Sequence, residues 1–332
     1  MDRVVTWQPA ERADLLREAA ALKGMVPEIV EKDLWVCWVL DRLFADPGLA
    51  KKLLFKGGTS LSKVFGLIER FSEDIDLILN WNEVASADPL AERSNTRQDA
   101  FNKQLIADTR RYLAEVLLPE VRRLIGDPCQ VDIGDHPDII SIRYPAAFAS
   151  EYLRPQIQLE IGCLAAWVPN AEYRIQPYVA EALPQFFDRS MVRVQAVRAE
   201  RTFWEKVTIL HHEAHRPEGL PVPSGYSRHY YDVCRMSQAG VKQSALQDLD
   251  LLRQVVEFKQ KFYHRGWARY DRATPGTMKL VPPEHVESAL RRDYEEMRFM
   301  IYGDRPRFSD VMHAVQQLEE EINRLESEGR EA

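Results

Sequence analysis

Two aspartates separated by one residue are the side chains in this sequence best suited to chemistry. Asp74 and Asp76 lie in the run 74–79, which has the length and apolar content of a β-strand. Because side chains alternate along a strand, both carboxylates would share one face, with their Cα atoms about 6.6 Å apart. Carboxylate oxygens suit Mg²⁺ or Mn²⁺, which keeps waters and substrate phosphates as its other ligands. The pair therefore indicates a metal-assisted phosphoryl-transfer site, unless it is a solvent-facing acidic edge.

A glycine pair precedes these acids and predicts a phosphate-binding turn. The apolar run 53–56 predicts a strand, Gly57, Gly58, Thr59 and Ser60 follow it, and apolar residues then repeat at helical spacing. Glycines let a ligand approach the backbone, and a helix N-terminus offers free N–H groups to phosphate oxygens. The segment has neither a Walker A nor a G-x-G-x-x-G pattern. The alternative is an ordinary strand-to-helix turn with Thr59 or Ser60 as the N-cap.

A third acid lies in a later strand. Alternation places Glu160 and Gln158 on one face of the run 156–161, where Glu160 could complete the metal site or be an exposed strand residue. A nuclease of the PD-(D/E)xK type would need a lysine two residues later, where Gly162 stands. A glycosyltransferase could use the acidic pair but would leave the glycine turn unexplained. The order of glycine turn, helix, acidic strand and later acid resembles the nucleotidyltransferase fold of the polymerase β type.

Further motifs resemble the AbiEii/AbiGii toxin family, which includes the MenT toxins. They extend over nearly the whole chain, at residues 31–35, 70–77, 205–206, 228–232 and 293–297. The resemblance implies a toxin or phage-defence enzyme that transfers nucleotides from an NTP, with tRNA 3′ ends as acceptors for some members. A cognate antitoxin is a further expected partner. The alternative is a non-catalytic NTP- or RNA-binding module with a degenerate nucleotidyltransferase fold.

The resemblance also implies roles for single residues. Asp74 and Asp76 would bind metal, Lys206 would contact the nucleotide phosphates, and Asp232 would lie at the active centre, while the third acid is Glu160 here rather than Asp. Helical spacing places Lys206 at the edge of an apolar face, from which an ammonium could reach a phosphate. The alternative is a surface lysine paired with a neighbour such as Glu205. Asp232 could orient or deprotonate an attacking hydroxyl, or be a surface residue.

Two other clusters invite functional interpretations. The sequence His211-His212-Glu213-Ala214-His215 lacks the H-E-x-x-H order of zinc proteases, so we predict a solvated helix end. Basic and aromatic residues interleave in the segment 259–272, where Arg265 and Arg269 would contact an RNA acceptor. The alternative there is a helix with an aromatic core stripe and a basic solvent face.

Composition limits the remaining possibilities. With 44 basic and 51 acidic residues the net charge is −7, so any nucleic-acid surface must be local. The longest apolar runs fall short of the roughly 20 residues that a membrane span needs, and no secretory signal is readable at the N-terminus. We therefore predict a cytoplasmic protein, and we separately expect a monomer. The four cysteines are widely spaced and are predicted to be buried thiols.

The coarse pattern predicts an α+β fold. Helices are expected over residues 7–46. Strands are expected at 53–56, 74–79, 130–133, 138–144 and 156–161, and the sheet is expected to end near residue 196. A polar surface loop is expected over 83–99. We predict a nucleotidyltransferase lobe at 1–197 with a mixed sheet and a mainly helical lobe at 198–332. The final helix carries one apolar stripe, which favours packing on its own domain over an oligomer contact.

Overall fold

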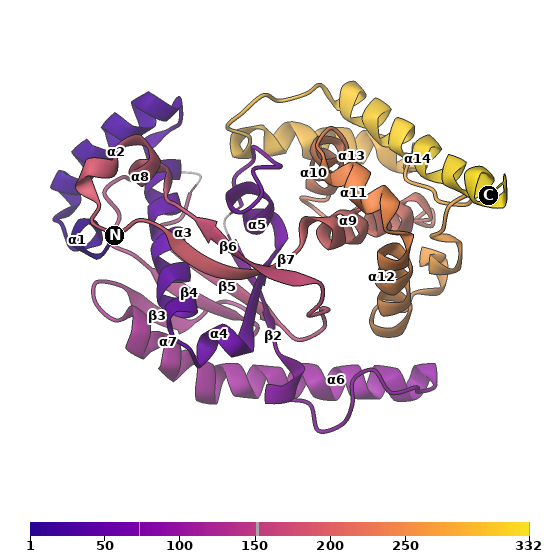
Figure 1. The fold of residues 1–332 in the computed structure, drawn as a ribbon, viewed down its shortest axis with the longest axis horizontal. Coiled ribbons are helices and arrows are strands. Elements are labelled where there is room, and N and C mark those ends of the chain that lie inside the picture. Colours follow the sequence, from indigo (N-terminus) through magenta and orange to yellow (C-terminus); the bar gives the residue numbers. More distant parts are fainter. Residues whose placement is uncertain (73, 151–152, 332) are drawn as a thin grey trace. The chain divides into compact units, whose positions relative to one another are not determined.

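The computed structural model describes residues 1–72, 74–150 and 153–331 (Figure 1). Contacts divide the chain into two compact units. The first comprises Met1–Val64, Phe71–Glu92 and Ala100–Val197, and the second comprises Phe65–Arg70, Arg93–Asp99 and the chain from Arg198 onward. The sequence predicted one boundary near residue 197 and did not anticipate the two short segments that join the second unit. Glu73, part of the motif at 70–77, lies outside the described residues.

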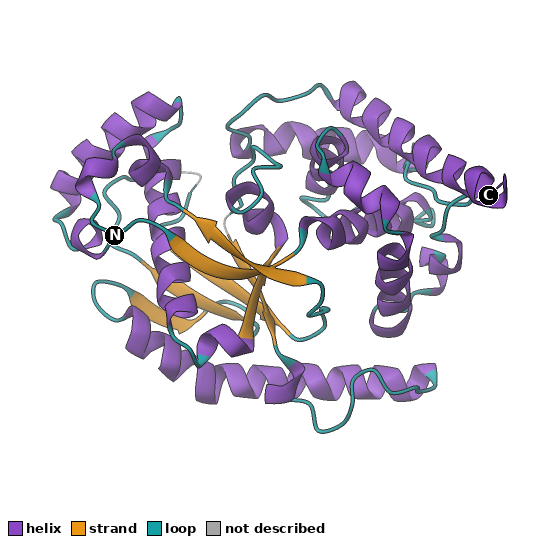
Figure 2. Cartoon of the chain, in the orientation of Figure 1, coloured by secondary structure: helices purple, strands orange, loops and turns teal. Residues whose placement is uncertain are grey.

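The first unit is built on a seven-stranded mixed sheet (Figure 2). The strand order is β3-β4-β5-β2-β1-β7-β6, in which β1 is parallel to β7, β2 is parallel to β5, and the other neighbours are antiparallel. The strands are β1 (Leu53–Lys56), β2 (Asp74–Leu79), β3 (Gln130–Ile133), β4 (Ile139–Arg143), β5 (Gln156–Gly162), β6 (Asn170–Ile175) and β7 (Val192–Val197). This mixed sheet, together with the many helices of the chain, confirms the predicted α+β class.

The central strands follow the predicted alternation. Ile75 and Leu77 of β2 are fully buried, whereas Asp74 and Asp76 lie on the opposite face and are half-buried. β2 pairs with β1 in antiparallel register, which places Lys56 opposite Asp76. Both strands have the predicted bounds, and the expected pairing between them is confirmed. The acids are thus held on a rigid element at the centre of the sheet.

Helix α3 (Pro27–Ala45) packs on β5 and β7 and anchors the glycine turn. Its buried Asp33 accepts hydrogen bonds from Lys63 Nζ at 2.9 Å and from the Tyr178 backbone N–H at 2.6 Å. Lys63 also donates to the Gln176 carbonyl at 2.7 Å. Lys63 is the last residue of α5 (Gly57–Lys63), so this buried ion pair fixes the helix that follows the turn.

The other helices before residue 198 complete the first unit or enter it from the segment at 93–99. They are α1 (Asp2–Val5), α2 (Pro9–Lys23), α4 (Leu49–Lys52), η1 (Trp81–Glu83), α6 (Asn95–Tyr112), η2 (Leu113–Leu117), α7 (Leu118–Ile125), α8 (Tyr178–Ala182) and η3 (Pro184–Phe186). Helix α6 begins at Asn95, so the predicted surface loop at 83–99 ends earlier than expected.

The second unit is mainly helical, as the sequence indicated. Its elements are α9 (Ala199–Ala214), α10 (Ser227–Ser237), α11 (Val241–Gln247), α12 (Leu249–Phe262), η4 (Gly266–Ala268), η5 (Tyr270–Arg272), α13 (Glu284–Glu296), η6 (Met297–Met300) and α14 (Phe308–Glu331). Val311, Val315, Leu318 and Ile322 of α14 are buried, and this helix packs on α10. The predicted packing of the final helix on its own domain is confirmed.

Two further predictions concern the whole chain. Cys37, Cys129, Cys163 and Cys234 are buried free thiols, as expected. Over the described ranges, no helix combines the length and the apolar character that crossing a bilayer requires.

Candidate functional site

Asp76 lies directly against the glycine turn. Gly57 has a φ of +80°, in the left-handed region that glycine adopts without a steric penalty, and a Cβ atom there would lie 1.9 Å from Oδ2 of Asp76. Only glycine fits this position. The structure therefore brings together two of the features that the sequence singled out, the first glycine of the pair and the second acid of β2.

The hydroxyls of the turn hold the backbone in place. Thr59 and Ser60 are buried; Thr59 Oγ1 donates to the Asp74 carbonyl, and Ser60 Oγ donates to the Gly57 carbonyl at 2.9 Å. Lys56, the N-cap residue of α5, makes no capping hydrogen bond with its side chain. In the nucleotide site predicted at residues 57–60, the groups suited to meeting a phosphate are thus backbone N–H groups. The Thr59 hydroxyl links the turn to β2, and the Ser60 hydroxyl bonds within the turn.

The third predicted acid shares the sheet face of the aspartates. β2 and β5 are parallel, and Asp76 is in register with Glu160 while Asp74 is in register with Gln158. Residues in register on adjacent strands point to the same face, so Asp76 has Glu160 on one side and Lys56 on the other. Glu160 is exposed, and Lys56 is half-buried.

This donor set fits a divalent ion that arrives with its substrate. Across residues 1–72, 74–150 and 153–331, no three His, Cys, Asp or Glu side chains form a group that could hold a metal by themselves. Mg²⁺, however, is commonly bound by one or two carboxylates plus substrate phosphates and waters. The adjacent carboxylates of Asp76 and Glu160, with Asp74 on the same face, match that requirement but do not form a complete protein cage.

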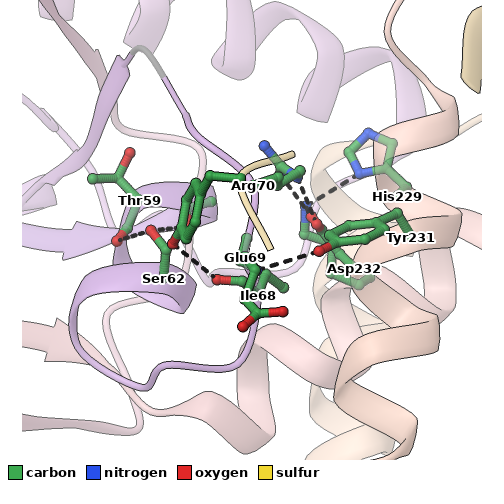
Figure 3. Close-up of polar contacts among 11 residues, drawn as sticks. Thr59, Ser62, Ile68, Glu69, Arg70, His229, Tyr231 and Asp232 are labelled. Atoms are coloured by element: carbon green, nitrogen blue, oxygen red, sulfur yellow. Dashed lines mark hydrogen bonds and ion pairs between the residues drawn. The ribbon is translucent and has the colours of Figure 1, made fainter. Parts of the chain in front are cut away.

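The second unit holds a buried cluster of charged groups around Asp232 (Figure 3). Arg70 donates from Nε to Oδ1 of Asp232 at 2.7 Å and from Nη2 to Oδ2 at 2.8 Å. Lys206 Nζ donates to the same Oδ2 at 2.8 Å and to Nδ1 of His229 at 3.2 Å. The Asp232 side chain is 0% exposed and that of Arg70 is 2% exposed. Residues from α9, α10 and the segment 65–70 thus meet at one carboxylate.

Backbone and surface contacts hold the segment 65–70 in this unit. Arg70 forms a β-bridge with Ile301, and the Glu69 backbone N–H donates to the Tyr231 hydroxyl at 3.3 Å. The Glu69 carboxylate pairs with Arg235 of α10 at 2.7 Å. These contacts explain why Arg70 reaches Asp232 from a distant part of the sequence.

The surroundings set the protonation of the cluster. Burial alone would raise the pKa of Asp232, but the cations of Arg70 and Lys206 hold that pKa below its ordinary value. Burial lowers the pKa of Lys206, against the opposing charge of Asp232. Burial and the Lys206 charge lower the pKa of His229 well below its usual range, so the neutral ring accepts from Lys206. Asp232 is therefore an ionised, weakly basic anchor for two cations.

Lys206 is buried, at 8% exposure, and is held by Asp232 and not by its neighbour Glu205. Glu205 pairs instead with Arg201 at 3.1 Å. An ammonium has three N–H donors. Within the described part of the chain Lys206 Nζ meets two acceptors, so one donor is left for a ligand.

The prediction of a solvated helix end at residues 211–215 is wrong. His211 is fully buried: its Nε2 donates to the Arg269 carbonyl at 2.9 Å and its Nδ1 accepts from the Lys279 N–H at 3.1 Å. Burial lowers the pKa of His211 to about 4. Glu213 is also buried and pairs with Arg216 at 2.6 Å. These residues pack the second unit, because the helix end is covered by the segments around residues 269 and 279.

The segment proposed for RNA contact is not one continuous helix. Helix α12 ends at Phe262, and Arg269 has a φ of +49° between two 3₁₀ turns. Arg269 pairs with Asp271 at 3.0 Å on the surface, while the exposed Arg265 lies over the ring of Trp267, 6.0 Å from its centroid. The ring of Trp267 also lies tilted against that of His212, with 4.3 Å between ring centroids. The basic groups thus project from an irregular loop that is fixed by aromatic packing.

Sequence reasoning gave no role to Lys56, Arg70 or His229. Lys56 directly precedes the glycine pair, and the other two lie inside the motifs at 70–77 and 228–232. The position of Arg70 and His229 within those motifs could have indicated a functional role, but the local sequence pattern does not predict which residues they contact.

A match to a protein-family model is consistent with these motifs. A family model described as "Nucleotidyl transferase AbiEii toxin, Type IV TA system" matches residues 38–318. Among solved structures, MenT4, a nucleotidyltransferase toxin from Mycobacterium tuberculosis, is 15% identical with a TM-score of 0.39, covering 91% of this chain and 98% of its own. JHP933 from Helicobacter pylori is 13% identical with a TM-score of 0.36, covering 88% and 93%. No curated protein matches the sequence.

Proposed function

Because this chain belongs to the AbiEii family of nucleotidyl transferase toxins of type IV toxin–antitoxin systems, we propose that it transfers a nucleoside monophosphate from an NTP to the 3′ end of a tRNA. The family implies an NTP substrate and an antitoxin partner. The RNA acceptor, the dependence on Mg²⁺ or Mn²⁺, a role in phage defence and a cytoplasmic site of action are parts of this proposal.

The proposed reaction is one displacement at phosphorus. The 3′-hydroxyl oxygen of the acceptor bonds to the α-phosphorus while the bond from that phosphorus to the α–β bridging oxygen breaks. Pyrophosphate leaves, the RNA gains one nucleotide, and the hydroxyl proton is released to water. Catalysis of such transfers consists mainly of positioning and charge stabilisation, which are the functions that this chain's residues would supply.

We assign the following residues roles in the proposed transfer reaction. In the first unit, the N–H groups of Gly57 and Gly58 would donate to phosphate oxygens. In the second unit, the remaining N–H of Lys206 would bind a nucleotide phosphate. Asp74, Asp76 and Glu160 would hold a divalent ion, which when bound neutralises triphosphate charge. Asp232 would hold Lys206, because its carboxylate already accepts from two cations and is too weak a base to take the hydroxyl proton.

The contact between Asp76 and Gly57 is the observation that carries the proposal. It places a carboxylate suited to a metal against a turn suited to a phosphate, and a substrate triphosphate with its ion needs both at one place. A glycine turn used only for folding would not require a half-buried carboxylate packed against it.

A labelling experiment tests the proposal. Purified protein is incubated with each α-³²P-labelled NTP, MgCl₂ and total RNA, and we expect label at RNA 3′ ends, absent with Asp76→Asn or with EDTA. Label on another RNA, a protein or a small molecule would show that this molecule, and not the tRNA 3′ end, is the acceptor. NTP binding without transfer in any of these mixtures would indicate a non-catalytic module.

Growth tests the toxin assignment separately. Expression of the wild-type chain in a bacterial cytoplasm should arrest growth, and Asp232→Ala should relieve the arrest. Harmless expression at a confirmed protein level would contradict the toxin role while leaving the transfer reaction to be judged by the labelling assay.

A further inference from the structure

We propose that Arg70 and His229 are positioning residues for Lys206, Arg70 acting through Asp232 and His229 acting directly. This inference rests on the proposed function, in which the Lys206 ammonium binds the phosphates of the NTP. It assigns a task to two residues that contact the nucleotide-binding lysine or its anchor.

Arg70 fixes the plane of the Asp232 carboxylate. Its guanidinium donates two hydrogen bonds, one to each oxygen, at 2.7 and 2.8 Å. A bidentate Arg–carboxylate pair is geometrically specific, because both groups are planar and the two bonds are parallel. Lys206 donates to Oδ2, which also accepts from Arg70 Nη2, so the position of this shared oxygen depends on the orientation that Arg70 gives the carboxylate. Without Arg70 the carboxylate could turn and draw the ammonium to either oxygen.

His229 supplies the second fixed acceptor. Its Nδ1 lies 3.2 Å from Lys206 Nζ, and its ring is held edge-on against Tyr226 with 5.1 Å between centroids. The lowered pKa of His229 keeps the ring neutral, so this nitrogen remains an acceptor. Two fixed acceptors define the direction of the ammonium, and its third N–H then points along one line. That directed donor is what a phosphate oxygen would meet.

A nearby ion pair offers a matched control. Arg235 and Glu69 join the same two elements, the segment 65–70 and α10, at 2.7 Å. Their side chains are 27% and 41% exposed. Removing Arg235 therefore removes a charge and a link between these elements, while the Arg70–Asp232–Lys206 contacts keep their partners.

Double-mutant cycles on nucleotide affinity test the inference. ATP, GTP, CTP and UTP are titrated with MgCl₂ into the full chain by calorimetry, and the tightest ligand is used throughout. We expect Lys206→Ala and Arg70→Met each to weaken binding about tenfold. Because Arg70 acts through Lys206, the double variant should bind no more weakly than Lys206→Ala alone. Arg235→Met should leave the affinity unchanged.

His229 gives an independent cycle if Arg70→Met does not fold. His229→Leu should weaken binding in the wild-type background but not in the Lys206→Ala background, and His229→Gln, which retains an acceptor oxygen, should recover part of the affinity. Full additivity of either residue with Lys206→Ala would overturn its positioning role. If Lys206→Ala alone binds NTP like the wild type, the nucleotide role of Lys206 in the proposed function fails, and this inference fails with it.

Discussion

The two units treat their charged residues in opposite ways. In the first unit Asp74, Asp76 and Glu160 line one face of the sheet and are half-buried or exposed. In the second, Asp232 is fully buried and its charge is matched inside the protein by Arg70 and Lys206. A carboxylate near solvent can be ionised at little cost to folding, whereas a fully buried one must be paired with a cation before the protein is stable.

This difference separates activity from stability. Substitutions on the sheet face should remove transfer and leave folding nearly intact, and substitutions in the buried cluster should damage both. The following predictions are ordered by their expected effect on the free energy of unfolding.

Asp232→Ala should cost about 3–5 kcal/mol, because it leaves two buried cations without the carboxylate that neutralises them. Urea unfolding followed by far-UV circular dichroism measures the loss. Glu69→Ala, which breaks the more exposed pair with Arg235, is the control and should cost less than about 1 kcal/mol. If Asp232→Ala lowers the free energy of unfolding as little as the control does, the buried cluster is no more important for stability than the acids on the sheet face.

Acid should destabilise the protein through His211. Its folded pKa is about 4, below the ordinary value of about 6.5, so the unfolded chain binds more protons between these pH values and stability falls as the pH drops. Lowering the pH from 7 to 5 should cost about 2 kcal/mol from this residue. His211→Gln should flatten the pH dependence, whereas substitution of the exposed His313 should not. An unchanged slope in His211→Gln would show that another group governs it.

Gly57→Ala should cost about 1–3 kcal/mol, because alanine is strained at a φ of +80° and its Cβ would collide with Asp76. Transfer should fall together with stability. Gly24→Ala is a matched control: Gly24 has a φ of +65°, but a Cβ there would meet no atom within 4 Å. If the two variants are equally active, the close approach of Asp76 to the turn has no functional importance.

Asp76→Asn and Asp74→Asn should each abolish transfer while changing the free energy of unfolding by less than about 1 kcal/mol, since neither carboxylate is needed for core packing. The labelling assay and urea unfolding report the two effects on the same samples. Asp132→Asn, an exposed acid of β3, should retain transfer. Destabilisation as large as that of Asp232→Ala would show that the sheet face is as tightly integrated as the buried cluster.

Arg265→Ala combined with Arg269→Asn should leave stability unchanged and weaken RNA binding. Asparagine is chosen at 269 because it tolerates the left-handed backbone there. Each lost phosphate contact should reduce the slope of log affinity against log salt by about 0.7 for single-stranded RNA. Arg253→Ala, on the exposed surface of α12, is the control. If the wild type, the double variant and the Arg253→Ala control have equal salt slopes, the RNA acceptor binds to another surface of the protein.

Local pattern was sufficient for most of the sheet. β1 and β2 have the predicted bounds because apolar runs there are closed by Gly57 on one side and Asn80 on the other. The strand β6 has polar residues at most positions and was not predicted individually, since it gains its place by pairing with β7. Strand alternation placed Asp74 with Asp76, and Glu160 with Gln158, on one face of their own strands. The register shows that the two faces are the same face of the sheet.

Contacts between distant residues were not readable in the same way. Arg70 and Asp232 are 162 positions apart, and no periodicity in either segment names the other. His211 was misjudged because the residues that bury it come from loops near 269 and 279 and not from its own helix. The basic segment 259–272 has helical composition, but the chain leaves the helix after Phe262.

The placement of Arg70 also has a consequence during synthesis. This guanidinium leaves the ribosome 162 residues before the carboxylate that receives it, and Lys206 precedes Asp232 by 26. At about 5–20 residues per second, the delay between Arg70 and Asp232 is about 8–32 seconds. During that interval the nascent chain carries the acidic strand and the glycine turn but lacks the anchor for its lysine. A toxin assembled in this order gains the anchor of its lysine only when Asp232 has been translated.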